Sequence, residues 1–244
     1  MFIFCVILFG KILDSLGRQR LFFLFAFNPT VLIHLVLEAH NEVIILFLLL
    51  GSVYMLLRRR SLIGGLLTIS MILIKYYPII ILPIFILKRK KQGNKLLWTK
   101  QFFLSSLLIT LLIIFSFFVI KHPNLKPFLD QNLNLRRDIG CFHRCSPIVS
   151  LTRYVFAENE GLVRTTVFVA FYLLLIYYLL IKNFMLLEFL FFALSATFFI
   201  FISWLTPWYL VLPISIGVLL SNRRSYLFLV IVLTFYSLFH YFGY

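Results

Sequence analysis

The sequence has few charged residues, and only eight of its 244 residues are acidic. Charged residues make up 13% of the chain, whereas hydrophobic residues make up 62%. A water-soluble domain needs a more strongly charged surface, so this composition excludes one and indicates a polytopic membrane protein. The apolar runs are continuous and do not alternate with polar residues, which excludes a transmembrane β-barrel.

Cysteine is also scarce, with three residues in the whole chain. Cys141 and Cys145 lie in the stretch "CFHRC". An oxidising exterior would allow a disulfide there, but two cysteines do not establish one. A zinc site would need more ligands, and only His122 and His143 lie nearby. No cluster of carboxylates favours a metal either, so we expect no metal and no cofactor.

The chain lacks the marks of a cleavable signal peptide. Residues 1–13 are apolar, but no basic segment precedes them and no small-residue cleavage site follows.

The formal charge of +15 suggests nucleic acid at first sight. The basic residues lie in short loops between apolar runs, however, which favours topology signals and contact with lipid head groups. Nucleic acid is therefore excluded as a partner, and membrane lipids are expected.

Long apolar runs are abundant, and they predict an all-α fold. About 20 helical residues span the hydrocarbon core of a bilayer, so the shorter runs must borrow flanking residues. We expect a single transmembrane domain over residues 1–244, a polytopic bundle of about nine or ten membrane helices with no internal repeat. The runs are 1–13, 21–37, 43–57, 61–74, 77–87, 101–120, 165–181, 184–206, 208–221 and 226–244.

Runs 61–74 and 77–87 predict a short hairpin with its tip near Lys75. A break is expected at Tyr77–Pro78, because proline lacks a backbone N–H and disfavours a helical residue before it. With this hairpin, the basic loops all fall on the cytoplasmic side, and residues 121–164 form an extracytoplasmic loop. A single helix over 61–87 would instead separate the basic loops. The predicted location is the plasma membrane, as a multi-pass protein.

The same topology gathers polar residues on the extracytoplasmic side, although charges at membrane depth are costly and mark functional sites. Glu42 could take a proton from an acceptor hydroxyl or hold sugar hydroxyls. Lys75 could offset negative charge on a departing phosphate. Trp208 and Tyr209 offer flat faces for a sugar ring. The candidate site residues are His34, Glu38, His40, Asn41, Glu42, Lys75, Tyr76, Tyr77, Trp208 and Tyr209.

Structural interpretations of the same residues remain open. "EAHNE" (38–42) could be a solvated connection between helices. Lys75 could extend its ammonium group to the membrane surface. "TPWY" (206–209) could be an interfacial aromatic belt at the start of a helix.

A series of motifs lies between Asn28 and Leu87: Asn28-Pro29, His34, His40-Asn41-Glu42, a basic turn, Gly64-Gly65 and Lys75-Tyr76-Tyr77-Pro78. This segment resembles the polyprenol-phosphate-mannose-dependent mannosyltransferases of the glycosyltransferase C superfamily, above all the bacterial α-mannosyltransferases of lipoglycan mannan cores. "WLTPWYLVLPI" (204–214) resembles a late motif of the same enzymes.

The resemblance implies transfer of a sugar, mannose in this family, from a polyprenyl-phosphate donor to a glycan or glycolipid acceptor. It implies transfer on the extracytoplasmic face, with inversion at the anomeric carbon and catalytic roles for His40, Asn41, Glu42 and Lys75. The family usually carries an essential aspartate in a first outer loop. Here only Asp14 lies near the start, on the cytoplasmic side. We therefore expect an N-terminally truncated or split enzyme, in which Glu42, Asp130 or Asp138 could substitute.

Three alternatives to a single-sugar transferase remain. The chain could be a non-enzymatic carrier or flippase of lipid-linked glycans, which the missing repeat disfavours. It could instead polymerise or ligate whole lipid-linked oligosaccharides. It could also be an inactive fragment of a larger transferase that supports a complex.

Overall fold

The computed structural model describes residues 1–75, 77–82, 104, 151, 154–155, 160–181, 186–201 and 206–242. Several predictions lie outside these ranges: Tyr76, the run 101–120, the second arm of the hairpin beyond Leu82, and most of the loop 121–164. Asp130, Asp138, the two cysteines of "CFHRC" and both nearby histidines lie outside them as well. Across the described ranges the secondary structure is helical, with no strand.

Two long helices and a bent pair have the length and composition to cross a membrane. The long helices are α10 (Glu160–Ile181) and α13 (Arg224–Phe242). A third span is possible within the described residues if the pair Gln19–Ala26 and Pro29–Leu37 crosses as one. These helices confirm an all-α membrane bundle, and the larger number of spans stays a prediction.

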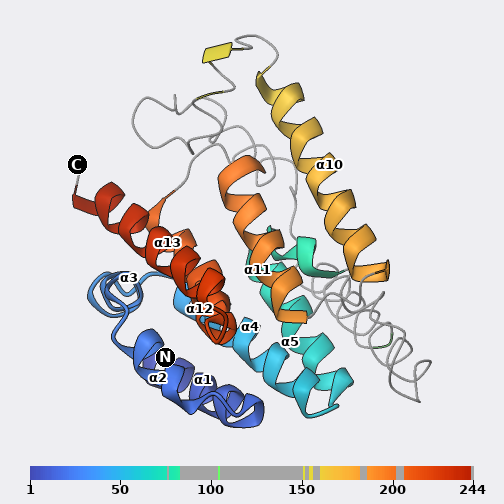
Figure 1. Cartoon of the computed structure of the whole chain (residues 1–244). Helices are drawn as coiled ribbons and strands as arrows, with labels where there is room; N and C mark the ends of the chain where they lie inside the picture. Colours follow the sequence, from blue (N-terminus) through green and yellow to red (C-terminus); the bar gives the residue numbers. More distant parts are fainter. Residues whose placement is uncertain are drawn as a thin grey trace, which may run out of the picture.

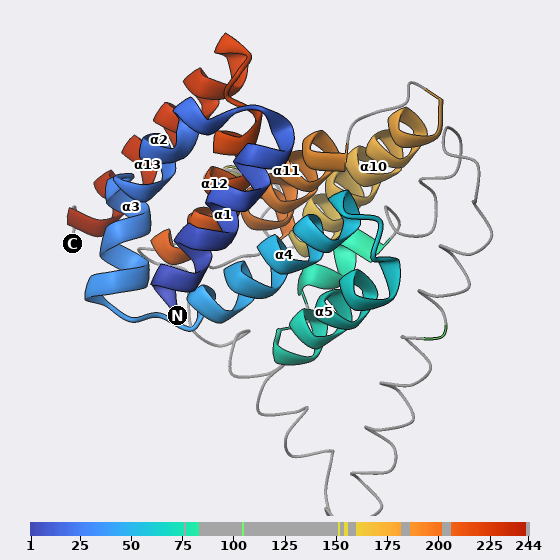
Figure 2. The same ribbon diagram turned by 90° about the horizontal axis from the view of Figure 1, so that it is seen from below.

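The first helices form one layer of the bundle. Helix α1 (Phe2–Leu16) packs on α4 (Glu42–Leu57), and α4 packs on α5 (Ser61–Ile74). Figure 2 shows these three helices lying side by side. α4 is apolar all round, as expected of a helix with neighbours on several sides. Gly64 allows the close approach of α5, since a Cβ there would lie 3.1 Å from the side chain of Leu56.

The second layer consists of α10, α11 (Leu186–Ala196), α12 (Val211–Leu220) and α13. α12 packs between α11 and α13 and also contacts α4, so every one of its residues is buried. In Figure 1, α10 lies at the outer edge of the bundle beside α11. A π-helix (Thr197–Phe201) follows α11, and a short 3-10 helix (Pro207–Leu210) precedes α12.

The predicted single helix over 21–37 is wrong. The chain forms a 3-10 turn (Gln19–Leu21), α2 (Phe22–Ala26), α3 (Pro29–Leu32) and a π-helix (Ile33–Leu37), with a bend of 55° between the two halves. Pro29 cannot continue a helix, and Asn28 takes an extended conformation. The Asn28 side chain then accepts a hydrogen bond from the Val31 N–H at 3.3 Å and begins a new helix.

The interruption near the predicted hairpin tip occurs slightly earlier than expected. α5 ends at Ile74, Lys75 is extended, and a 3-10 helix covers Tyr77–Ile81. The chain therefore leaves the α-helix two residues before Tyr77–Pro78, and Pro78 lies inside the 3-10 helix.

The bundle has two chemically different ends. At one end, Arg18 donates to the Leu219 carbonyl, Arg20 donates to Asn222, and Arg223 pairs with Glu188 at 2.8 Å. The arginine turn Arg58–Arg60 closes α4 and opens α5 at the ends of those helices remote from Glu42 and Lys75. Glu42 and Lys75 meet at the opposite end.

Candidate functional site

The site is organised by a sharp turn between the π-helix and α4. The backbone N–H of His40 donates to the His34 carbonyl at 3.1 Å, which folds the chain back on itself. Ala39 has a φ of 47°, in the left-handed region that non-glycine residues seldom adopt. His40 and Glu42 are two residues apart in sequence, and this tight turn brings their side chains into contact.

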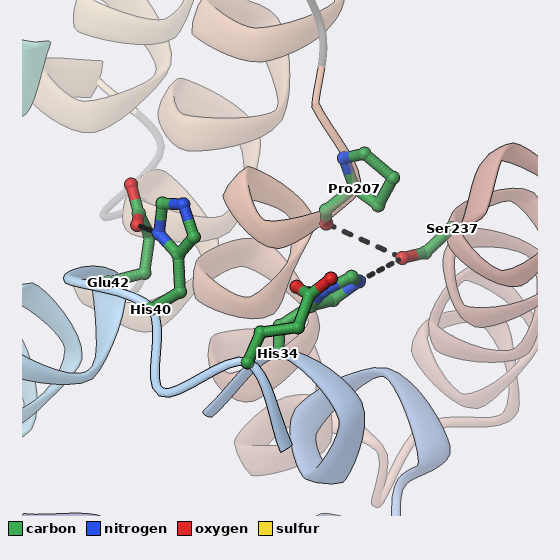
Figure 3. Close-up of polar contacts among 6 residues, drawn as sticks. His34, His40, Glu42, Pro207 and Ser237 are labelled. Atoms are coloured by element: carbon green, nitrogen blue, oxygen red, sulfur yellow. Dashed lines mark hydrogen bonds and ion pairs between the residues drawn. The ribbon is translucent and has the colours of Figure 1, made fainter. Parts of the chain in front are cut away.

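Glu42 is the centre of the cluster, and its side chain has no exposed surface. One carboxylate oxygen, Oε2, contacts Nδ1 of His40, and the other, Oε1, accepts from Nζ of Lys75. An unpaired buried carboxylate would cost several kcal/mol, about the scale of desolvating one ion, and the contacts with His40 and Lys75 offset that cost. Figure 3 shows the His40–Glu42 contact.

Lys75 reaches Glu42 because α5 ends one residue earlier. Its extended backbone (φ −142°, ψ 134°) leaves the helical path, and its side chain is 21% exposed. The ammonium nitrogen lies 5.1 Å from the ring centre of Tyr209, a cation–π distance. Lys75 is thus held between a carboxylate and an aromatic ring while part of it stays accessible.

Trp208 joins the short 3-10 helix to this cluster. The His40 ring stacks on Trp208 with centres 4.2 Å apart and planes 23° apart. The His40 side chain remains 28% exposed. With Nδ1 directed at the carboxylate, Nε2 is the ring nitrogen left to exchange a proton with a bound molecule.

A second histidine–carboxylate pair lies beside the first. Nδ1 of His34 contacts Oε2 of Glu38 at 2.6 Å, and His34 is fully buried. Nε2 of His34 faces the Ser237 hydroxyl at 3.5 Å, and the same hydroxyl donates to the Pro207 carbonyl at 3.4 Å. Ser237 of α13 thus joins the π-helix to the start of the Trp208 segment (Figure 3).

Residues 3–89 match the model of the MptA_B family, described as alpha-(1->6)-mannopyranosyltransferase, N-terminal domain. This part of the chain is therefore similar to a mannosyltransferase domain. The match covers about a third of the chain and includes His34, Glu42 and Lys75. It confirms the resemblance seen between Asn28 and Leu87, whereas the late motif at 204–214 lies beyond it. No curated protein and no solved structure gave a match.

The mannosyltransferase segment does not contain the whole cluster. Trp208, Tyr209 and Ser237 come from the second layer and close the site over His40 and His34. The family supports a mannosyltransferase function, with a sugar donor and a glycan acceptor as substrates. In a membrane protein with this match, the buried carboxylate and its neighbours are the candidate active site.

The structure brings most of the predicted residues together, in two different environments. His34, Glu38, His40, Glu42, Lys75 and Trp208 form the polar cluster just described, and Asn41 is exposed beside it. Tyr77 and Tyr209 are instead buried, and each packs its ring against Phe198 with centres 5.2 Å apart. Of the predicted flat faces for a sugar, Trp208 is therefore the accessible one.

Ser237 was missed by sequence analysis. It lies in the apolar stretch "FYSLFHYF", and nothing near it in sequence marks a site. A weak signal does exist. Thr234, Ser237 and Tyr241 are spaced three and four residues apart and therefore share one face of α13. That face meets Asn28, Thr30 and His34, with Nδ2 of Asn28 donating to the Thr234 hydroxyl at 3.0 Å.

Proposed function

We propose that the protein is a membrane glycosyltransferase that moves mannose from a polyprenyl-phosphate donor to a glycan or glycolipid acceptor on the extracytoplasmic face. One observation carries the proposal. The segment that matches the mannosyltransferase family also contributes His40, Glu42 and Lys75, and these three residues meet around one buried carboxylate.

His40 is the best-placed general base. Both oxygens of Glu42 are engaged and the side chain is fully buried, so Glu42 has no surface from which to hold sugar hydroxyls. His40 is partly exposed, and Glu42 fixes its orientation through Nδ1. A histidine held by a carboxylate is a recurrent general base, because the carboxylate stabilises the imidazolium that forms. Glu42 then acts as a positioning residue.

The transfer step balances with these groups. The acceptor oxygen attacks the anomeric carbon of mannose, and its proton passes to Nε2 of His40. The bond between the anomeric carbon and the phosphate oxygen breaks, and its electron pair leaves on the lipid phosphate. The ammonium of Lys75 is the cation available to offset the growing phosphate charge.

The distribution of basic residues supports an extracytoplasmic site. Short loops rich in Lys and Arg stay on the cytoplasmic side. In the described part of the chain, the basic turns at 18–20, 58–60 and 222–224 lie at the end of the bundle remote from Glu42. With those turns in the cytoplasm, the cluster around Glu42 faces the other side.

The test is a transfer assay in membranes that contain the full chain, a radiolabelled polyprenyl-phosphate mannose and a mannan acceptor. Glu42→Gln removes the carboxylate charge that supports His40 and Lys75. Lys75→Ala removes the cation. We expect each variant to lose at least about 100-fold in transfer rate, the usual scale for a lost acid–base or electrostatic contribution.

Matched controls are Glu188→Gln and Lys11→Ala. Glu188 is a second buried carboxylate with a cationic partner, but it lies at the opposite end of the bundle. Lys11 is exposed on α1. Both controls should transfer mannose at the wild-type rate. Full transfer activity in Glu42→Gln and Lys75→Ala would contradict the site assignment. Movement of the lipid across sealed vesicles without a covalent product would make the protein a carrier instead.

A further inference from the structure

A cavity of about 360 Å³ lies between α1, α4 and α5. Its size falls in the range of about 300–1,000 Å³ that is usual for ligand pockets. Its walls are apolar and include Phe4, Ile7, Phe47, Gly51, Met55 and Ile63. Phe4, Ile7 and Ile63 are exposed, so the cavity opens to the surface.

Gly51 helps to keep this space open. It lies on α4 at the floor of the cavity, and a Cβ there would come within 3.1 Å of the Leu67 side chain. A larger residue would fill the gap between α1 and α5. The groove therefore runs between α1 and α5, and the middle of α4 forms its floor.

The arginine turn (58–60) connects two residues that line the groove, Met55 on α4 and Ile63 on α5, and so lies next to that end of it. The N–H of Arg60 donates to the Met55 carbonyl at 2.8 Å, and the Arg60 carbonyl accepts from Gly64 at 3.0 Å. The turn is thus bonded directly to groove residues and their neighbours on both α4 and α5. Arg59 has a φ of 61°, which makes the turn tight.

The three arginines are exposed, and none forms an ion pair with a carboxylate within the described part of the chain. The guanidinium of Arg58 lies 5.4 Å from the Tyr54 ring centre, a cation–π contact that supplies no negative charge. An apolar groove that ends at three unneutralised cations is complementary to one kind of molecule, an acyl chain joined to an anionic head group.

We propose that this groove binds one anionic phospholipid of the bilayer, with an acyl chain along Gly51 and the phosphate on Arg58–Arg60. Basic residues beside membrane helices bind anionic head groups, and apolar area adds affinity for the chain. The site is separate from the catalytic cluster, because the arginine turn and Glu42 lie at opposite ends of α4, about 24 Å apart at 1.5 Å per residue.

Native mass spectrometry of the purified full chain tests the proposal. The protein in detergent is titrated with dioleoyl phosphatidylglycerol or dioleoyl phosphatidylcholine, and bound lipid is counted. We expect tighter binding of phosphatidylglycerol. Arg58→Gln combined with Arg60→Gln should weaken it by at least about tenfold, since each cation contributes about a fivefold factor. Arg20→Gln combined with Arg224→Gln removes the same charge from exposed residues outside the groove lining and should have no effect.

A second pair of variants tests the groove itself. Ile63→Trp fills the groove, whereas Leu62→Trp adds the same bulk at the neighbouring position, outside the groove. Their exposures of 38% and 37% are matched, so neither should harm the fold. We expect Ile63→Trp alone to lower phosphatidylglycerol binding. Equal binding of both lipids, no effect of the arginine variant, or equal effects of the two tryptophans would each overturn the proposal.

Discussion

Glu42 and Glu188 are both buried carboxylates, yet their surroundings differ. Glu188 pairs with Arg223, whose side chain is 65% exposed, at the basic end of the bundle. Glu42 has two partners from different segments, and the whole carboxylate is enclosed. Glu188 therefore fits a structural ion pair, while Glu42 holds in place two groups that remain accessible. This contrast makes Glu188→Gln the informative control for Glu42→Gln.

The stacking of His40 on Trp208 gives a prediction at the same scale. Aromatic pairs contribute about 0.5–1.5 kcal/mol beyond buried area, so losing the ring should misplace His40. We expect Trp208→Ala to lower the transfer rate by about tenfold and Trp208→Phe to lower it less. Initial rates with the labelled donor measure both. Phe228→Ala, an exposed aromatic on α13, serves as the control. A wild-type rate in Trp208→Ala would contradict the role of the stack.

At the level of single residues, sequence patterns predicted the grouping but not its geometry. The hairpin tip and the positions of the basic loops were enough to bring Lys75 near Glu42. They could not reveal that both oxygens of Glu42 are occupied, because that depends on the left-handed turn at Ala39 and on the extended backbone of Lys75. The sequence did not predict Ser237 as a site residue, because its partner, His34, is 203 residues away.

Among the elements, hydropathy located the helices but not the breaks inside them. The run 21–37 is mostly apolar, so the bend at Asn28–Pro29 was visible only in the proline and its capping residue. The π-helices at Ile33–Leu37 and Thr197–Phe201 left no trace in the pattern. In a membrane, the face of a helix that packs in the bundle and the face that contacts lipid are both hydrophobic. The periodicity of apolar residues therefore carries little information about such local changes.

Packing of α12 between its neighbours yields a stability prediction. A Cβ at Gly217 would lie 2.6 Å from a Val230 methyl carbon and 2.9 Å from the Phe191 ring. Gly217→Ala should therefore destabilise the protein by about 1–3 kcal/mol, the usual cost of overpacking. Thermal unfolding in detergent, followed by loss of soluble protein, measures the shift.

Gly10→Ala is the matched substitution in α1. There the nearest atom would be 3.5 Å away, an ordinary contact, and alanine favours a helix by about 1 kcal/mol. We expect this variant to unfold at the wild-type temperature or slightly above it. If Gly217→Ala were equally stable, α12 would not be packed as tightly as described.

The whole molecule has a basic end and an end that carries the His40–Glu42–Lys75 cluster. The short basic loops and the hairpin predicted this separation, and α4 runs from Glu42 at one end to the arginine turn at the other. The number of membrane spans was less predictable, because helices such as α4 and α5 are too short to cross alone and their packing decides how deep they lie.

Sidedness can be measured with single cysteines. Asn41 and Asn222 are exposed at opposite ends of the bundle. In a background with the three native cysteines replaced, a membrane-impermeant maleimide should label Asn41→Cys in intact cells. Asn222→Cys should react only after permeabilisation. The reverse pattern would place the catalytic cluster in the cytoplasm and would rule out the proposed site of transfer.

The contact between His34 and Ser237 can form only late in the synthesis of the chain. The π-helix that carries His34 leaves the ribosome long before α13 does. At about 5–20 residues per second, the intervening 203 residues take about 10–40 s to synthesise. During that interval His34 and Asn28 already lie in the membrane without their partners on α13. A nascent chain therefore lacks the contacts of Ser237 with His34 and of Thr234 with Asn28 until α13 has been made.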